Sequence, residues 1–149
     1  MGMPMAEAGS DALLAHSGVR LAAGVRDGTL SPVALVEHSI RRCQTVQRRC
    51  NAVAVALYDQ ARRAAEVAER QRDQGAPLGR LHGVPFSFKE GLGLADAPKT
   101  CGSRRRQHKV AGFTATAAQR LIDAGAIPVA LGNQAEMALW PETDNPVYG

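Results

Sequence analysis

Apolar and polar positions along the chain follow the periods of helices and of short buried strands. Helical periods cover residues 11–28, 31–50, 58–75 and 114–125, and each ends near a glycine or a turn signal. Short apolar runs predict strands over residues 51–57, 84–88 and 126–131, and a further short strand is expected near Leu92–Ala95. Helices that alternate with short apolar strands favour an α/β architecture in which helices cover the sheet on both faces.

The helical periods also predict which side chains face the core. Every fourth position or so is apolar, as expected for a stripe on one side of each helix. The predicted inward residues are Leu14, Leu21, Ala22, Val25, Val36, Ile40, Cys43, Cys50, Ala61, Ala64, Ala65 and Ala68.

Capping signals fix the starts of two helices. Ser31 is suited to the N-cap and Pro32 to the first helical position, which places a helix start between them. Thr114 is expected to cap the helix over residues 114–125.

The three predicted strands all have the pattern of interior strands, and the stretch up to Gly149 ends in turn residues. We therefore expect the N-terminal part of a longer fold.

Composition is that of a globular protein, because 45% of residues are hydrophobic and 21% are charged, with a net charge of +4. The one dense basic run, residues 103–109, has no interleaved aromatic residue for stacking on bases. A solvated loop is therefore the favoured interpretation, and an RNA-binding domain ranks last among the functions considered.

Cysteine and histidine spacing argues against a metal site. The three cysteines include no CxxC pair, and the four histidines show no ligand spacing, so no metal is predicted.

Residues 1–10 are expected to be a flexible tail, and residues 11–149 one domain. Neither a signal peptide nor an apolar stretch of membrane-spanning length is recognisable, so a soluble cytoplasmic protein is expected.

Lys89 stands out because the chain contains fifteen arginines and only three lysines, the others being Lys99 and Lys109. It ends the predicted strand over residues 84–88, where ligands collect in open α/β sheets. A desolvated lysine there could act as a general base towards a nucleophile. The competing interpretation is that its ammonium reaches water or pairs with Glu90.

The stretch "LHGVPFSFKEG" around this lysine resembles the lysine motif of the amidase signature family, the serine amidases with a Ser–cis-Ser–Lys triad. The stretches "LSPVALVEHSIRRCQTVQRRCNAVAV", "PKTCGS" and "AAQRLIDAGAIPVALGNQAEMALWPETDNPVYG" are similar to other parts of the same family, in the same order. "KEG" and "ALWPETDNPVYG" favour the branch of fatty-acid amide hydrolase-like enzymes. The resemblance implies the N-terminal portion of the amidase-signature fold, a mixed β-sheet covered by helices.

By this resemblance Lys89 is the catalytic lysine of an amide hydrolase that needs no cofactor, and Leu139 and Trp140 contact the substrate. Both could equally be plain core residues. The family's glycine- and serine-rich segment, which holds both triad serines, has no match here, so residues 11–149 are expected to be an incomplete amidase domain that is inactive alone. The implied partner is a small-molecule amide, without nucleic acid, and the full-length enzyme could form a homodimer. The alternatives are a glutaminase subunit of an amidotransferase and a non-catalytic binding module.

Overall fold

The computed structural model describes residues 15–149, and within that range three strands form one sheet in the order β1-β3-β2. β1 (Val53–Ala56) pairs antiparallel with β3 (Ile127–Gly132), and β2 (Pro85–Lys89) pairs parallel with it. The sheet is thus mixed, as the resemblance predicted. The parallel register brings Lys89 opposite Gly132, so the chain that follows β3 passes beside the lysine.

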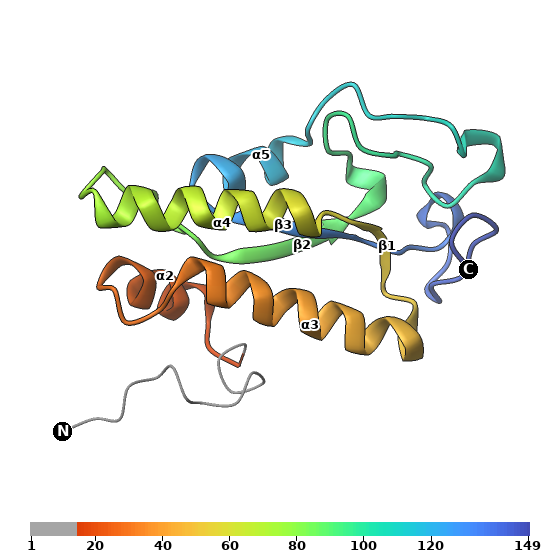
Figure 1. Ribbon diagram of the computed structural model, residues 1–149. Coiled ribbons are helices and arrows are strands. Elements are labelled where there is room, and N and C mark those ends of the chain that lie inside the picture. The colour runs from red at the N-terminus through yellow and green to blue at the C-terminus, as the bar shows by residue number, and fades with distance from the viewer. Residues whose placement is uncertain (1–14) are drawn as a thin grey trace.

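Two long helices cover this sheet. α3 (Pro32–Cys50) and α4 (Tyr58–Asp73) run side by side in opposite directions, and both contact β3 (Figure 1). α2 (Gly18–Arg26) packs against apolar residues at the start of α3 and against Val84. α5 (Thr116–Asp123) contacts β3. The α/β expectation is therefore confirmed.

The apolar core lies between the long helices and β3. α4 contributes three buried alanines to this core, and α3 contributes Val36 and Ile40. This cluster, named the apolar layer below, consists of Val36, Ile40, Ala61, Ala65, Ala68, Ile127, Val129 and Ala130.

Most of the predicted inward positions are confirmed, but two are wrong. Ala64 is exposed on α4, since it falls to the side of the alanine stripe. Cys50 is exposed at the last residue of α3, where the chain turns through the left-handed Asn51, while Cys43 packs against the apolar layer. The predicted tail and Leu14 lie outside the described residues.

Of the two predicted helix caps, the one at Ser31 is confirmed and the one at Thr114 is wrong. The Ser31 hydroxyl accepts a hydrogen bond of 3.1 Å from the Ala34 amide, and Pro32 occupies the first turn of α3. Thr114 does not cap α5, because its hydroxyl accepts from the Ala95 amide at 3.1 Å and Ala115 is the N-cap residue. Thr114 therefore ties two loops together instead of starting a helix.

Two strand predictions are corrected as well. Only β3 is interior, because β1 and β2 are the outer strands of the sheet in residues 15–149 and are half exposed. The expected strand near Leu92–Ala95 does not form, and a 3₁₀ turn over Glu90–Leu92 follows β2 directly. The first residue of that turn, Glu90, is completely buried.

Candidate active site around Lys89

Lys89 lies at the carboxyl end of β2, as predicted. Its side chain is exposed, and its Nζ donates a hydrogen bond to the backbone carbonyl of Asn133, the residue that follows β3. The parallel pairing of β2 with β3 explains this contact, since both strands end at the same edge of the sheet. Among the ion pairs of the described residues none joins Lys89 to Glu90, so the predicted alternative of such a pair is wrong. The exposure of Lys89 agrees with the other alternative, that its ammonium reaches water, and the expected desolvation of this lysine is wrong for the described residues.

A pocket of about 360 Å³ opens beside this amine. Its walls are mostly apolar, and Lys89 is the one basic or acidic side chain among the lining residues. These are Lys89, Gly91, Leu92, Cys101, Gln134, Met137 and Ala138. An amine that reaches such a pocket can exchange a proton with a group held there, which is the geometry that general acid–base catalysis requires.

The side chains of Leu139 and Trp140 lie outside this pocket. They are 81% and 70% exposed, so the interpretation of both as plain core is wrong. They directly follow the short 3₁₀ turn Glu136–Ala138, two of whose residues line the pocket. The predicted contact of both residues with substrate stays a prediction.

Glu90 is one of the residues whose buried position the sequence did not predict. It is completely buried, and its carboxylate accepts hydrogen bonds from the backbone amides of Thr100 and Cys101, the latter at 2.9 Å. The hydroxyl of Tyr148 adds a third donor at 3.3 Å, and burial raises the pKa of this phenol, which keeps its proton available for donation. A buried carboxylate is tolerated only with such partners. Glu90 thus fastens the turn at Thr100 to the end of β2.

Three residues on the pocket wall have left-handed backbone conformations. The φ angles are 51° at Cys101, 54° at Met137 and 57° at Ala138. Residues other than glycine adopt this region at a cost, and they do so where surrounding contacts hold them. Here the Met137 amide donates to the Cys101 carbonyl at 2.7 Å, which joins the two segments of the wall.

The serines that the structure describes do not complete a catalytic set with Lys89. Ser17 caps α2, Ser31 caps α3 and donates to Glu69 at 2.6 Å, and Ser39 lies within α3. Ser87 is exposed on β2, and Ser103 is buried in the turn after Gly102. No hydrogen bond among residues 15–149 joins a serine hydroxyl to the Lys89 amine. Within the described residues, the Lys89 amine therefore has no serine hydroxyl bonded to it.

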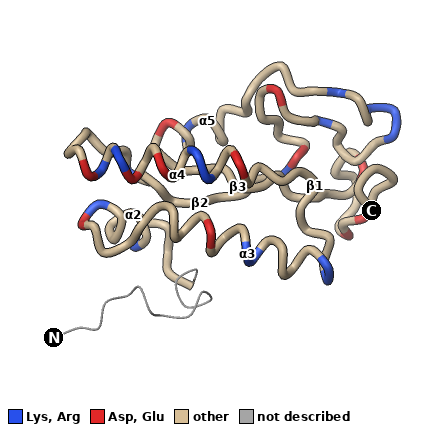
Figure 2. Tube along the Cα trace, viewed as in Figure 1, with Lys and Arg blue, Asp and Glu red and all other residues tan. Residues whose placement is uncertain are grey.

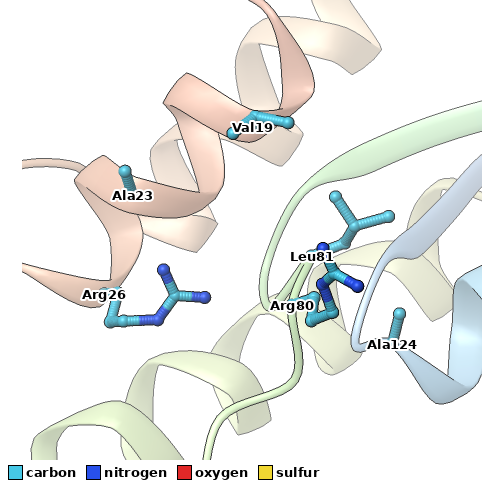
Figure 3. A pocket seen from close by; sticks show the side chains of 6 residues that line it. All are labelled: Val19, Ala23, Arg26, Arg80, Leu81 and Ala124. Carbon is cyan, nitrogen blue, oxygen red and sulfur yellow. The ribbon is translucent and has the colours of Figure 1, made fainter.

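A larger cavity, of about 530 Å³, lies away from Lys89, between α2, the loop before β2 and the end of α5 (Figure 3). Apolar side chains and the exposed Arg26 and Arg80 line it. Its lining contains neither a nucleophile nor a carboxylate, so the smaller pocket is the better candidate for chemistry. The lining residues are Val19, Ala23, Arg26, Arg80, Leu81 and Ala124.

The other sequence candidates behave as solvated or structural groups. The basic run forms a loop with a 3₁₀ turn at Arg104–Arg106, and its residues are exposed apart from the buried Ser103 and the half-buried Arg106 (Figure 2). His82 is buried, with Nε2 2.9 Å from the Ala68 carbonyl oxygen. Within the described part of the chain, no cluster of three potential metal ligands occurs. No described helix is long and apolar enough to cross a membrane.

The chain is similar in sequence to amide hydrolases and to an amidotransferase subunit. The chain is 38% identical over 133 residues to an indoleacetamide hydrolase of Bradyrhizobium diazoefficiens, covering 89% of this chain and 25% of that protein. It is 38% identical to a glutamyl-tRNA(Gln) amidotransferase subunit of Deinococcus deserti, covering 87% and 26%. It is 35% identical to fatty-acid amide hydrolase 2-B of Danio rerio, covering 92% and 27%. The chain thus spans about a quarter of the length of these relatives.

Structural comparison gives the same result. A bacterial aryl acylamidase of the amidase signature family superposes with a TM-score of 0.82 at 28% identity, over 90% of this chain and 28% of that one. The family model for Amidase matches residues 34–149, which include Lys89 and the whole pocket wall. Because this match covers most of the chain, the protein belongs to the amidase family.

Proposed function

We propose that this chain supplies the proton-transfer lysine of a Ser–cis-Ser–Lys amide hydrolase. The observation that carries the proposal is the Lys89 amine, held at the carboxyl end of a parallel strand beside an apolar pocket in a segment that matches the amidase family. Lys89 would accept the proton of a nucleophilic serine through a bridging serine, and would return it to the leaving amine. Both serines would come from outside residues 1–149.

The residue type supports this role. An arginine stays protonated in proteins and cannot act as a base, whereas a lysine amine can lose and regain its proton. Arginine serves nearly everywhere else in this chain, with fifteen arginines against three lysines. A positive charge alone would not call for a lysine at this position.

The substrate in this proposal is a small-molecule amide with an apolar acyl part. Leu92, Met137 and Ala138 give the pocket its apolar wall. Leu139 and Trp140, exposed beside that wall, are proposed to extend the contact with the acyl part. The reaction needs no cofactor, and the enzyme is proposed to act in the cytoplasm, with a homodimer of the full-length protein as its assembly.

A second candidate is the glutaminase reaction of an amidotransferase. The relative from Deinococcus deserti supports it, because its identity of 38% equals that of the indoleacetamide hydrolase. The two candidates share the proton-transfer lysine and differ in the amide. Turnover of glutamine, measured as ammonia release and compared with turnover of an apolar aryl amide, distinguishes them.

The test is a chimera in which residues 34–149 replace the matching segment of the indoleacetamide hydrolase. We expect the chimera to hydrolyse amides, and Lys89→Ala to lower kcat by about 10²–10⁴-fold, the usual contribution of general acid–base catalysis. Lys99→Ala and Lys109→Ala are the matched controls, since Lys99 lies over the Phe113 ring and Lys109 is in an exposed loop. A folded chimera without activity, or one in which Lys89→Ala is fully active, would favour a non-catalytic binding module.

A further inference from the structure

The backbone carbonyl that accepts the hydrogen bond from the Lys89 amine belongs to a buried asparagine, Asn133. Asn133 is 1% exposed, and its backbone amide donates to the Ala52 carbonyl at 2.8 Å. Its side-chain Nδ2 donates to two more carbonyls, those of Asn51 at 3.1 Å and Gly149 at 2.9 Å. Asn133 is therefore anchored to the start of β1 and to the far end of the chain.

A second buried asparagine completes the anchor. The Nδ2 of Asn145, which is 5% exposed, donates to Asn133 Oδ1 at 2.7 Å and to the Gln134 carbonyl at 2.8 Å. Asn145 Oδ1 accepts from the amides of Val147 at 3.0 Å and Tyr148 at 2.8 Å. Asn133 Oδ1 also accepts from the Gln134 amide at 2.9 Å. Both side-chain amides thus use their nitrogen and their oxygen, which fixes their orientation.

We propose that Asn133 and Asn145 are positioning residues for Lys89, an inference that rests on the proposed function. The pair fixes the Asn133 carbonyl in space, and that carbonyl selects one position for the Nζ of an otherwise exposed lysine. A free lysine side chain samples many rotamers. A fixed acceptor at its tip holds the amine where a serine hydroxyl can meet it.

The arrangement favours this role over a purely structural one. A buried polar pair that served only stability could be replaced by apolar residues with little loss. Here the pair holds groups bound to two residues that line the pocket. The Asn133 carbonyl accepts from Lys89, and the Gln134 carbonyl accepts from Asn145, while Gln134 Oε1 accepts from the Gly91 amide at 3.1 Å. The network therefore ends at two residues of the pocket lining, Lys89 and Gln134.

The test on the 149-residue chain is the substitution Asn145→Asp. It keeps the size and the acceptor oxygen towards Val147 and Tyr148, but it places a second oxygen against Asn133 Oδ1 and the Gln134 carbonyl. Nuclear magnetic resonance with ¹⁵N-lysine and ¹³C-carbonyl labels detects the coupling between Lys89 Nζ and the Asn133 carbonyl carbon. Only three lysines contribute signals, so assignment is direct.

We expect the coupling to be present in the wild-type chain and lost in Asn145→Asp, with faster motion of the Lys89 ammonium group. The signals of Lys99 and Lys109 should not change. The control is Asp144→Asn, the same kind of exchange at the preceding, exposed residue. If Asn145→Asp fails to fold, Asn145→Ser replaces it, because a serine hydroxyl can still accept from the following amides. An intact coupling in a folded Asn145 variant would overturn the proposal.

The chimera provides the catalytic measurement. We expect Asn145→Asp to lower kcat about 10–10²-fold and to leave KM nearly unchanged, since misplacement of a catalytic group by about 1 Å costs on this order. An active chimera in which Asn145→Asp has wild-type kcat overturns the positioning role and leaves the proposed function intact. A chimera inactive with all native residues contradicts the proposed function, while the coupling measurement still decides whether Asn145 positions Lys89.

Discussion

β3 begins in the apolar layer and ends beside a cluster of buried polar residues. Its first residues pack in the apolar layer, where small and branched side chains from α3 and α4 meet the sheet. Its last residue leads into Asn133, and from there buried polar groups hold the chain. We name this second region the polar end: the buried residues Glu90, Thr100, Ser103, Asn133, Gln134 and Asn145.

The two regions differ in what their stability requires. Apolar contacts are not directional, so the apolar layer tolerates a change of shape that preserves volume. Hydrogen bonds in the polar end are directional, and a partner lost there leaves a buried group unpaired. The chain next to the polar end also contains left-handed residues that neighbouring contacts must hold, such as Cys101 and Met137. The molecule is therefore most sensitive to conservative changes beside the lysine.

The largest effect on stability is expected for Glu90→Gln. The glutamine has nearly the same shape, but its amide group faces a backbone amide donor at Thr100 or Cys101. We expect a loss of about 2–3 kcal/mol in the free energy of unfolding, the cost of an unpaired buried donor. Urea unfolding measures it. A loss no larger than that for an exposed Glu66→Gln would break the contrast between the two regions.

A smaller loss is expected for Gly102→Ala. Gly102 has a φ of 70°, and a Cβ added there would lie 2.8 Å from the Cβ of Asn145. The left-handed conformation and the close contact together should cost about 2 kcal/mol. The matched control is Gly28→Ala, whose φ is 80° but whose Cβ would meet nothing within 4 Å. Thermal unfolding of both variants separates the cost of conformation from that of contact, and equal losses would contradict the contact with Asn145.

In the apolar layer, Ile40→Val should cost less still. Ile40 is 1% exposed in α3 and packs against β3 and α4, so removal of one methyl group leaves a small cavity. We expect a loss of about 0.5–1.5 kcal/mol in the free energy of unfolding. Urea unfolding beside Glu90→Gln gives the comparison directly. A loss equal to or above that of Glu90→Gln would reverse the ranking of the two regions.

The smallest effect is expected at the surface ion pair between α3 and α4. The hydrogen bond from Arg62, 2.6 Å from the Glu37 carboxylate, holds the pKa of Glu37 below its ordinary value of 4.5. Because the folded pKa is the lower one, the stabilisation is present above the unfolded pKa and is lost as the pH falls through the folded pKa. Glu37→Gln should therefore lower the melting temperature slightly at neutral pH and not in acid. A difference that grows in acid would contradict this sign.

Sequence periodicity was informative for the apolar layer. The start of α3 at Ser31 and Pro32 is confirmed, because capping is a local property of neighbouring residues. Ala64 was misassigned because a helix rich in alanine has no large side chains to define its buried face. The α5 cap at Thr114 was wrong because a tertiary contact with Ala95 competes for the hydroxyl.

The polar end was much harder to predict. Lys89 could be selected as a candidate because lysine is rare in this chain and ends a predicted strand, but only the resemblance to the amidase signature family gave it a role, which stays a proposal. Glu90, Asn133 and Asn145 could not, since acidic and amide side chains next to glycine and proline are typical of exposed turns. Their burial depends on partners far away in sequence, such as Thr100 for Glu90 and Asn51 for Asn133. The one local signal was an acidic residue placed between an apolar strand and Gly91.

The most direct measurement of the central claim is the turnover of an aryl amide by the active chimera that contains Lys89→Arg. Arginine keeps the positive charge and can still donate to the Asn133 carbonyl, but it cannot accept the proton of a serine. We predict a loss of kcat nearly as large as that of Lys89→Ala, about 10²–10⁴-fold. Wild-type turnover by Lys89→Arg would show that the position needs only a charge, and would contradict the assignment of Lys89 as the base.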